Sequence, residues 1–435
     1  MTRSIKPLSK TWPFAAITTL LAWQLMLLPR AAVAGTTFGI YDARTLAMGS
    51  SSVASATNGN AQFYNPALLA FNTEIEERTQ DAGFYFPLLI SHLSESAITS
   101  VDISRDDPEQ LISRSIDDFN ANPNQVTAQA VADATASFDA SLAKIEDEDL
   151  FADIYIGSGG GEAGLFNGAG FFFGARILAG GESAVTAEDR TLLATYNEAL
   201  TFIATNGMQG VAHPELFDAN GELIDPNNDF DSTASASGAV VTEAGVAMSR
   251  QIQLFGGSVA AGLTVKALRV EAFEDVQRIV DDRIRVDANS NSHAGLNVDI
   301  GFAKVYRESL RLGLAIKDVV PRDFRTSQTE IVRLRPRARV GAAYQLARVQ
   351  IAGDVDITRN KPIGTEEPTQ EAVIGAEWEL NVVKLRTGYR HDILGNRDGV
   401  ISAGAGVAWN RLIVDLAIAA SGDAKSAAVQ FGLAF

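Results

Sequence analysis

Acidic and amide side chains gather in one stretch of the chain, where their oxygens could bind a divalent cation. Asp218, Asn220 and Glu222 surround Gly221, and Asp225 follows. Calcium loops of the EF-hand type use such ligands, but they need glycine at the sixth position and glutamate at the twelfth, whereas this glycine comes fourth. The pattern therefore favours a simple Asp/Asn-Gly turn, and we predict no metal site.

Histidines and glycines give no catalytic site either. Four histidines lie without metal-ligand spacing and belong to no recognisable Ser/His/Asp set: His92, His213, His293 and His391. Gly159, Gly161 and Gly164 match G-x-G-x-x-G, but strand-like residues 170–177 follow them instead of a helix, and no P-loop lysine follows. These glycines are predicted to form a turn between two strands. We predict no catalytic residue, no cofactor and no enzymatic activity.

Charged residues in the carboxy-terminal half can pair across tight hairpins. A turn after residue 346 places Arg339 opposite Asp356. A turn after residue 380 gives two more pairs, which are Glu379 with Lys384 and Glu377 with Arg386. This row of charges could line an ion-selective pore, or it could fix strand register in a wet or plugged interior. Mixed signs give no ion selectivity, so the structural ladder is favoured.

The elements that carry these charges alternate between apolar and polar residues. Residues 309–319 place leucine and isoleucine on one face, with arginine, glycine, alanine and lysine on the other, and residues 349–358, 371–380 and 412–418 follow the same period. Strands of about ten residues joined by short polar links are typical of outer-membrane barrels. A soluble β-sandwich also alternates. The leader, the aromatic terminus and the strand length together favour the barrel.

The two ends of the chain agree with export to a membrane. At the carboxy terminus, Val429, Phe431, Leu433 and Phe435 share one face of a strand that ends on an aromatic residue. This strand resembles the terminal strand that the barrel-assembly machinery recognises, and we expect it to close the sheet against a first strand near residues 83–89.

The amino terminus has the features of a signal peptide. Three basic residues precede an apolar stretch over residues 14–28, and Ala32-Val33-Ala34 supplies the small residues of a cleavage site. We predict a signal peptide over residues 1–34 with cleavage after Ala34. An uncleaved anchor is the alternative, but the stretch is short for a span of about 20 residues.

Composition excludes several classes of protein. The 435-residue chain has a formal net charge of −17, and loss of the leader, with four basic residues and no acidic one, makes it −21. Such an acidic exported chain is not expected to bind nucleic acid. The chain has no cysteine, which excludes disulfides and thiolate chemistry.

Two segments do not follow the strand pattern. Residues 105–150 lack glycine and have apolar residues at helical spacing, and residues 188–237 begin with a helical pattern over 192–203 and continue as a loop. Because irregular backbone cannot face lipid, both inserts are expected outside the membrane or in the lumen.

Family resemblance is carried first by a motif near the amino terminus. Its residues resemble the R-x-L-A-M-G … N-P-A-x-L-A opening of the FadL-like outer-membrane superfamily: Arg44, Leu46, Met48, Gly49, Asn65, Pro66 and Ala67. Segments 243–248, 262–266, 335–341, 356–362 and 388–390 are similar to the conjugal transfer TraF-like subfamily. The resemblance implies a luminal plug over residues 35–75 and a barrel over residues 76–435.

The expected fold is therefore all-β, a transmembrane antiparallel β-barrel of about 14 strands with an N-terminal luminal plug and two partly helical inserts. The resemblance implies a passive uptake channel for hydrophobic or amphiphilic molecules in the outer membrane. A non-transporting component of a conjugation or secretion apparatus is the alternative. The expected partners are outer-membrane lipid and the barrel-assembly machinery, with a hydrophobic ligand or transfer-apparatus proteins depending on which function holds.

Overall fold

The computed structural model describes most of the chain in thirteen segments. They are residues 33–35, 37–71, 83–98, 108–146, 149–162, 168–209, 213–254, 257–280, 290–307, 309–325, 331–361, 367–422 and 424–434. Most of the predicted signal peptide, residues 1–32, lies outside the described residues, as does Phe435 of the predicted assembly signal. The predicted cleavage point falls within a short strand, β1 (Val33–Gly35), which pairs in parallel with β13 (Arg359–Lys361).

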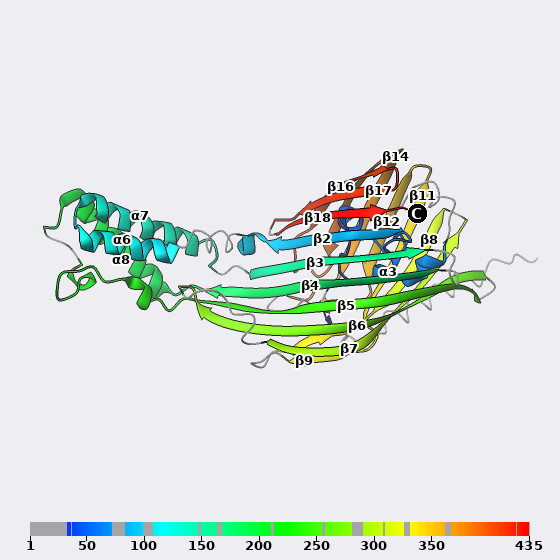
Figure 1. Ribbon diagram of the computed structural model, residues 1–435, viewed down its shortest axis with the longest axis horizontal. Coiled ribbons are helices and arrows are strands. Elements are labelled where there is room, and N and C mark those ends of the chain that lie inside the picture. The colour runs from blue at the N-terminus through cyan, green and yellow to red at the C-terminus, as the bar shows by residue number, and fades with distance from the viewer. Residues whose placement is uncertain are drawn as a thin grey trace, which may run out of the picture.

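Fourteen antiparallel strands form a closed barrel (Figure 1). In chain order they are β2 (Phe84–Ser94), β3 (Asp149–Glu162), β4 (Ala169–Ala184), β5 (Thr233–Leu254), β6 (Gly257–Arg278), β7 (Ser290–Tyr306), β8 (Leu310–Lys317), β11 (Arg337–Leu346), β12 (Val349–Asp356), β14 (Glu371–Leu380), β15 (Val383–Asp392), β16 (Val400–Trp409), β17 (Leu412–Ala420) and β18 (Ala424–Leu433). This confirms the predicted all-β barrel of about 14 strands.

The barrel has an apolar outside and a polar inside, as the strand alternation predicts. Ile374, Trp378 and Ile418 are exposed on the outer surface, whereas Glu377 and Asp415 on the same strands point inward and are buried. Outward side chains of this kind can face lipid, and closure leaves no unpaired strand edge.

Closure joins the last strand to the first. β18 pairs with β2 from Ala424 opposite Ser94 to Leu433 opposite Phe84, which is the pairing expected from the terminal sequence. The register shifts between Tyr85 and Leu88, on either side of Pro87. Proline has no backbone N–H to donate to a neighbouring strand, so a bulge is the expected result here.

The two ends of the barrel differ in their connections. At one end, short turns join the strands, and Ala347, Asn381 and Asn410 in these turns have φ of 52°, 57° and 58°. Positive φ is what two-residue hairpin turns of the favoured twist require. At the other end the connections are longer and include three helices (Figure 1). We call these the short-turn end and the helix-bearing end.

The two inserts form one helical module at the helix-bearing end. Its helices are α6 (Pro108–Ala121), α7 (Gln125–Leu142) and α8 (Ala187–Asn206), with short turns η3 (Pro214–Leu216) and η4 (Pro226–Asn228). The module has its own apolar core, in which Phe119, Phe138 and Phe230 are buried. Both predicted inserts extend too far, because β3 already begins at Asp149 and β5 at Thr233. No helix among the described residues is long and apolar enough to span a membrane.

Hydrogen bonds fix the second insert to the first. The Asn120 side chain bonds both the N–H (2.7 Å) and the C=O (2.9 Å) of Leu223. The Tyr196 hydroxyl donates to the Ile224 carbonyl at 2.7 Å, and burial, followed by the charges of Asp225 and Asp229, raises the pKa of Tyr196. The module is therefore a single packed unit.

The segment around Gly221 forms the predicted turn. Asp218 accepts hydrogen bonds from the backbone N–H groups of Asn220 (2.9 Å) and Glu222 (2.8 Å), while Asp225 accepts one from the Ser113 hydroxyl at 2.6 Å. The carboxylates thus serve the local backbone and the helix packing. The described residues contain no cluster of histidine and acidic side chains that could hold a metal ion.

A small hairpin packs against the inner wall near the helix-bearing end. β9 (Arg322–Arg325) pairs with β10 (Ile331–Leu334), and Phe324 and Leu334 pack on inward residues of β6, including Leu268 and Val270.

Candidate functional site

The lumen of the barrel is occupied by residues 37–71, which we call the luminal segment. It contains α2 (Ala43–Ala47), α3 (Ala61–Tyr64) and the turn η1 (Pro66–Ala70), and nearly all its side chains are buried. Figure 1 shows this part of the chain, in dark blue, within the ring of strands. Asp42 caps α2 by accepting from the Thr45 N–H at 2.9 Å, as expected at a helix start.

Arg44 joins the luminal segment to the barrel wall. Its guanidinium donates to both oxygens of Glu377, at 2.9 and 3.1 Å, and to the Gln350 side chain at 2.9 Å. It also donates to the Ser55 carbonyl at 2.9 Å, within the segment itself. A buried charge is tolerated only with such complete pairing, so Arg44 and its partners hold one another in place.

The same ion-pair network continues around the wall. Glu377 also accepts from Arg386 at 2.5 Å, and Arg386 donates to Asp415 at 2.5 Å. Asp415 accepts from the Gln430 amide at 2.9 Å, and the Gln430 oxygen accepts from the Ala43 N–H at 2.7 Å. The closing strand β18 is therefore tied back to the luminal segment.

Glycines let the luminal segment touch the wall backbone at Met48 and Gly49. A Cβ at Gly375 would lie 2.3 Å from the Met48 carbonyl oxygen, and one at Gly388 would lie 2.1 Å from the Gly49 nitrogen. Gly49 has φ of +64°, which favours glycine, and its N–H donates to the Ser402 hydroxyl at 3.0 Å. These contacts leave no space for a side chain at either wall position.

The Asn65-Pro66-Ala67 part of the family motif makes a second close contact. Asn65 donates to the Val53 carbonyl at 2.8 Å and to the Phe302 carbonyl of β7 at 3.2 Å, and its side-chain oxygen accepts from the Ala67 N–H. Pro66 takes the first position of η1, which suits its fixed φ. The motif residues thus position the luminal segment against the wall.

Aromatic side chains and Leu46 form the apolar part of the segment. Leu46 is buried in the main core cluster together with Tyr41, Phe63 and Tyr155. Tyr41 stacks on Phe63 at a centroid distance of 5.8 Å and meets Tyr155 of β3 edge-on at 5.1 Å. Burial, followed by the Asp42 carboxylate, raises the pKa of Tyr64 well above its ordinary value, so this phenol is a neutral hydrogen-bonding group.

The six charged residues of the predicted ladder lie on the inner wall in the predicted register. Arg339 lies opposite Asp356 and donates to it at 2.5 Å, Glu377 lies opposite Arg386, and Glu379 lies opposite Lys384 with a nitrogen–oxygen distance of 3.6 Å. The predicted ladder did not include Glu371, which shares the polar face of β14 with Glu377 and accepts from Arg339 at 2.7 Å.

A second buried cluster of charges was not anticipated. The Lys266 ammonium on β6 lies 2.7 Å from Asp318, 3.2 Å from Asp299 and 3.4 Å from Glu243. Arg337 pairs with the other oxygen of Asp318. Alternation along each strand could have placed Glu243, Lys266 and Asp299 in the lumen. Their pairing was not predicted, because the cluster combines residues of β5, β6 and β7 with Asp318 and Arg337, and no single tight hairpin brings all of these together.

The glycines of the G-x-G-x-x-G match have a packing role. Gly159 and Gly161 lie within β3 and not in a turn, while Gly164 lies outside the described residues. A Cβ at Gly161 would lie 2.4 Å from the Asn58 carbonyl oxygen of the luminal segment. The prediction of a turn was wrong because the strand extends through glycines that close packing requires.

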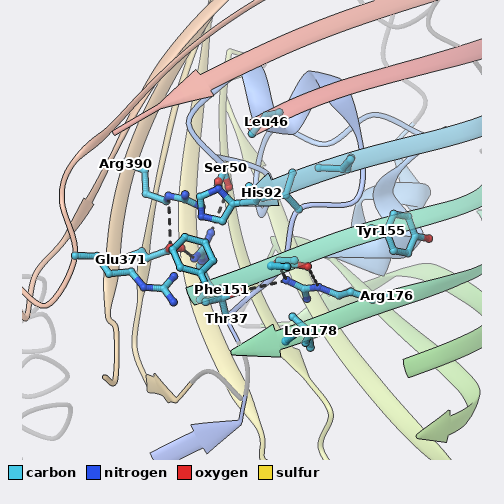
Figure 2. Close-up of a pocket in the computed structure, with 18 residues that line it drawn as sticks. Thr37, Leu46, Ser50, His92, Phe151, Tyr155, Arg176, Leu178, Glu371 and Arg390 are labelled. Atoms are coloured by element: carbon cyan, nitrogen blue, oxygen red, sulfur yellow. Dashed lines mark hydrogen bonds and ion pairs between the residues drawn. The ribbon is translucent and has the colours of Figure 1, made fainter. Parts of the chain in front are cut away.

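A cavity that is partly open to solvent lies between the luminal segment and the wall near the helix-bearing end. Thr37, Leu46 and Ser50 of the segment line it, opposite residues of β2, β3, β4, β14 and β15. Figure 2 shows His92, Phe151, Arg176, Glu371 and Arg390 around this space. The cavity combines apolar walls with several guanidinium groups, which suits a small molecule with a polar end.

The fold and this site define a class of protein, a 14-stranded β-barrel whose lumen is filled by its own amino-terminal segment. Residues 62–356 match the family model TraF_2, described as the F plasmid transfer operon TraF protein, and this span is more than half of the chain. The chain belongs to this family, which confirms the TraF-like resemblance.

Several solved structures are similar to the chain. The Ralstonia pickettii toluene transporter TbuX has 11% sequence identity and a TM-score of 0.47, covering 91% of this chain and 98% of that one. The Pseudomonas putida toluene transporter TodX has 12% identity and a TM-score of 0.43 over 93% and 100%. A Pseudomonas aeruginosa FadL homologue has 10% identity and a TM-score of 0.43 over 92% and 98%. None of the curated proteins compared with the chain matches it.

Proposed function

We propose that the protein is an outer-membrane β-barrel that takes up small hydrophobic or amphiphilic molecules passively, with the luminal segment as its plug. The cavity beside the luminal segment carries this proposal. It lies near the helix-bearing end, and Leu46 and Ser50 of the segment line it. A molecule that enters this cavity meets the luminal segment, so passage requires the segment to shift.

Export and assembly are part of this proposal. The signal peptide over residues 1–34 is removed, and the strand over residues 429–435 is recognised by the barrel-assembly machinery. The apolar outer surface supports a location in lipid, and outer-membrane barrels place short turns in the periplasm and longer loops outside the cell. Sequencing of the mature amino terminus tests the first step; it is expected to begin at Gly35.

A disulfide between the luminal segment and the wall tests uptake. A Cβ built on Gly170 of β4 lies 3.2 Å from the Cβ of Gln62 in α3, slightly closer than the roughly 3.5–4.5 Å of disulfides. The chain has no other cysteine to interfere. We expect vesicles with reduced Gln62→Cys/Gly170→Cys protein to admit toluene faster than protein-free vesicles, and the oxidised protein to lose this advantage.

The two single-cysteine variants are the controls for the disulfide. Each should admit toluene at the same rate with and without oxidant. Co-purified amphiphile in the detergent-extracted protein, identified by mass spectrometry, would support uptake. Equal flux in reduced-protein and protein-free vesicles, with no bound amphiphile, would contradict it.

A structural role in an envelope assembly is the second candidate, and the helical module favours it. The described module residues, 108–146 and 187–232 without 210–212, contain 15 acidic and three basic residues. A folded unit of such charge, standing beyond the barrel, suits a partner with a basic surface. Capture of the same partner by the wild type, but not by a variant with the module replaced by short linkers, would support this role. Capture of the partner by both proteins, at an affinity that does not change with salt concentration, would contradict the structural role.

A further inference from the structure

We propose that exposed aromatic and arginine side chains at the short-turn end bind the head groups of anionic glycerophospholipids. We call these residues the interfacial belt: Tyr306, Arg307, Tyr344, Arg348, Trp378, Trp409 and Arg411. This assignment rests on the membrane location proposed above and adds the class of lipid that one end of the barrel selects. The chain as a whole is not expected to attract anionic lipid, because its formal net charge is −17.

The aromatic residues mark the level of the belt in the membrane. Four strands, β7, β11, β14 and β16, each carry a tyrosine or tryptophan that is at least 46% exposed and lies no more than two residues from the strand end at the short turns. Tyrosine and tryptophan prefer the boundary between the apolar membrane core and the head groups. The turns beyond them therefore lie at the level of the head groups.

Three of these turns present an arginine. Arg307 directly follows the tyrosine of β7, and its guanidinium lies over that ring at 5.3 Å. Arg411 comes two residues after the tryptophan of β16, and Arg348 precedes the residue that pairs with the tryptophan of β14. All three arginines are exposed. Each one thus stands next to an aromatic residue of the belt, on the side away from the membrane core.

The arginines of the belt have no ion-pair partner within the described part of the chain. Arg348 donates a hydrogen bond to the Asn381 side chain at 3.3 Å, which leaves its charge uncompensated. Lys304 of β7 and Arg250 of β5 are also exposed near this end and form no ion pair with a described residue. These cations are free to bind an anion from outside the protein.

Acidic residues do not compensate the belt. From β5 through β8 and β11 to β17, the acidic residues described near the short turns are Glu377, Glu379 and Asp415, which lie on the inner wall and pair with basic residues there. Glu308 follows Arg307 and lies outside the described residues, and even with it the three turns hold three arginines and one acidic residue. Residues 72–82, with four acidic residues and one arginine, also lie outside the described residues and precede β2, which is not part of this arc.

Net charge decides which phospholipid such a belt prefers. A guanidinium can donate two parallel hydrogen bonds to the phosphate of any phospholipid, so phosphate binding alone does not distinguish anionic from zwitterionic lipid. An uncompensated cation at the membrane surface favours an anionic head group by about fivefold. Arg269, towards the helix-bearing end, pairs with Glu271 at 2.6 Å and offers no such net charge. The preference should therefore be confined to the short-turn end.

Quenching of tryptophan fluorescence by brominated phospholipid measures this preference at the belt itself. The chain has four tryptophans, and two of them, Trp12 and Trp23, lie in the predicted signal peptide. The protein purified from membranes should therefore report from Trp378 and Trp409, both in the belt. It is reconstituted in vesicles that mix brominated phosphatidylcholine with unbrominated phosphatidylglycerol or unbrominated phosphatidylcholine. We expect phosphatidylglycerol to bind at the belt about threefold to tenfold more strongly than phosphatidylcholine, and the difference to shrink as salt is raised.

A triple variant tests whether the arginines cause the preference. Arg307→Gln/Arg348→Gln/Arg411→Gln should reduce it to less than about twofold, whereas lysine at the same three positions should retain it, because lysine keeps the charge. If the triple variant does not insert, Arg411→Gln in a Trp378→Phe background reads Trp409 alone and should lose the preference relative to Trp378→Phe. Equal binding of the two lipids by the wild type, or an unchanged preference in the glutamine variants, would overturn the lipid belt.

The matched control removes the same number of charges at the other end. Arg269→Gln/Arg359→Gln/Lys361→Gln replaces three exposed basic residues towards the helix-bearing end and should keep the wild-type preference. An equal loss in this control would show a general charge effect and overturn the local belt. Sedimentation with purified peptidoglycan that depends on the three belt arginines, without any lipid preference, would also overturn it.

The lipid belt and the proposed uptake fail separately. A preference for phosphatidylglycerol that depends on the belt arginines, without toluene flux into vesicles, would support the belt and contradict uptake. Toluene flux without any lipid preference would support uptake and overturn the belt.

Discussion

Arg44 is the residue whose pairing couples the luminal segment most directly to the wall, and its loss should be costly. Glu377 is buried and accepts short hydrogen bonds from two arginines, Arg44 and Arg386. In Arg44→Met, only the bond from Arg386 is left. Breaking a buried ion pair costs about 3–5 kcal/mol, and the remaining arginine places the expected loss near the lower value. Guanidinium unfolding of the detergent-solubilised protein, followed by tryptophan fluorescence, measures it.

An exposed ion pair is the matched control for Arg44. Lys425 lies 3.2 Å from Glu95, and both side chains are 59% exposed. Lys425→Met should cost less than about 1 kcal/mol, because water and salt screen such pairs. Similar losses for the two variants would mean that the Arg44 network contributes no more than a surface pair.

A glycine in the wall offers a separate test of how the segment is seated. A methyl at Gly388 would meet the Gly49 nitrogen at 2.1 Å, whereas a methyl at Gly353 has its nearest neighbour at 3.1 Å. We expect Gly388→Ala to lower the free energy of unfolding by about 1–3 kcal/mol through overpacking. Gly353→Ala should have a smaller effect in the same denaturant titration. A neutral Gly388→Ala would show that the luminal segment is loosely seated.

Residue-level prediction from the sequence was possible where a tight turn fixes the geometry. Arg339 and Asp356 are joined by one hairpin, so alternation and turn length suffice to place them opposite each other. Arg44 and Glu377 are 333 positions apart, and no local pattern connects them. Arg390 was likewise missed as a site residue, because the cavity exists only once the luminal segment is in place.

At the scale of elements, the helical module should be able to unfold while the barrel stays folded. Phe119 is buried in the module core, whereas Val126 on α7 is 78% exposed. Phe119→Ala should cost about 3–5 kcal/mol of module stability, and Val126→Ala less than about 0.5 kcal/mol. Limited proteolysis should cut Phe119→Ala between residues 108 and 232 while the barrel stays intact on a heat-modifiability gel. Loss of the folded barrel band would contradict an independent module.

Element types were predictable, but some of their ends were not. The helical spacing in residues 105–150 and 192–203 correctly indicated helices, because a 3.6-residue period is a local property. The second insert was predicted to run to residue 237, yet β5 begins at Thr233. Residues 233–237 are all small and carry no strongly apolar side chain, and they form a strand because β4 and β6 pair with them.

At the scale of the whole molecule, barrel closure and filling of the lumen depend on the same side chains. Alternation and strand length predicted the strands, the family resemblance and the even strand number of bacterial barrels predicted about 14 of them, and the terminal strand predicted closure. How the lumen is filled could not be predicted, because it depends on glycines such as Gly375 and Gly388. Their lack of a side chain leaves space for the Met48–Gly49 backbone. A glycine in a strand indicates that another part of the structure lies close to the strand backbone, but it does not identify that part.

The orientation of the molecule gives the last prediction. Long connections and the helical module lie at one end and tight turns at the other, so the module should face the exterior and the turns the periplasm. The native chain has no cysteine, so a single introduced thiol reports its own side of the membrane. In intact cells, an impermeant maleimide should label Val126→Cys on α7 but should label the exposed Arg348→Cys in a short turn only after the outer membrane is permeabilised. Both sites are exposed, so accessibility within the fold does not favour either one. Labelling of Arg348→Cys alone in intact cells would reverse the orientation and place the cavity mouth towards the periplasm, which would contradict entry of the ligand from outside.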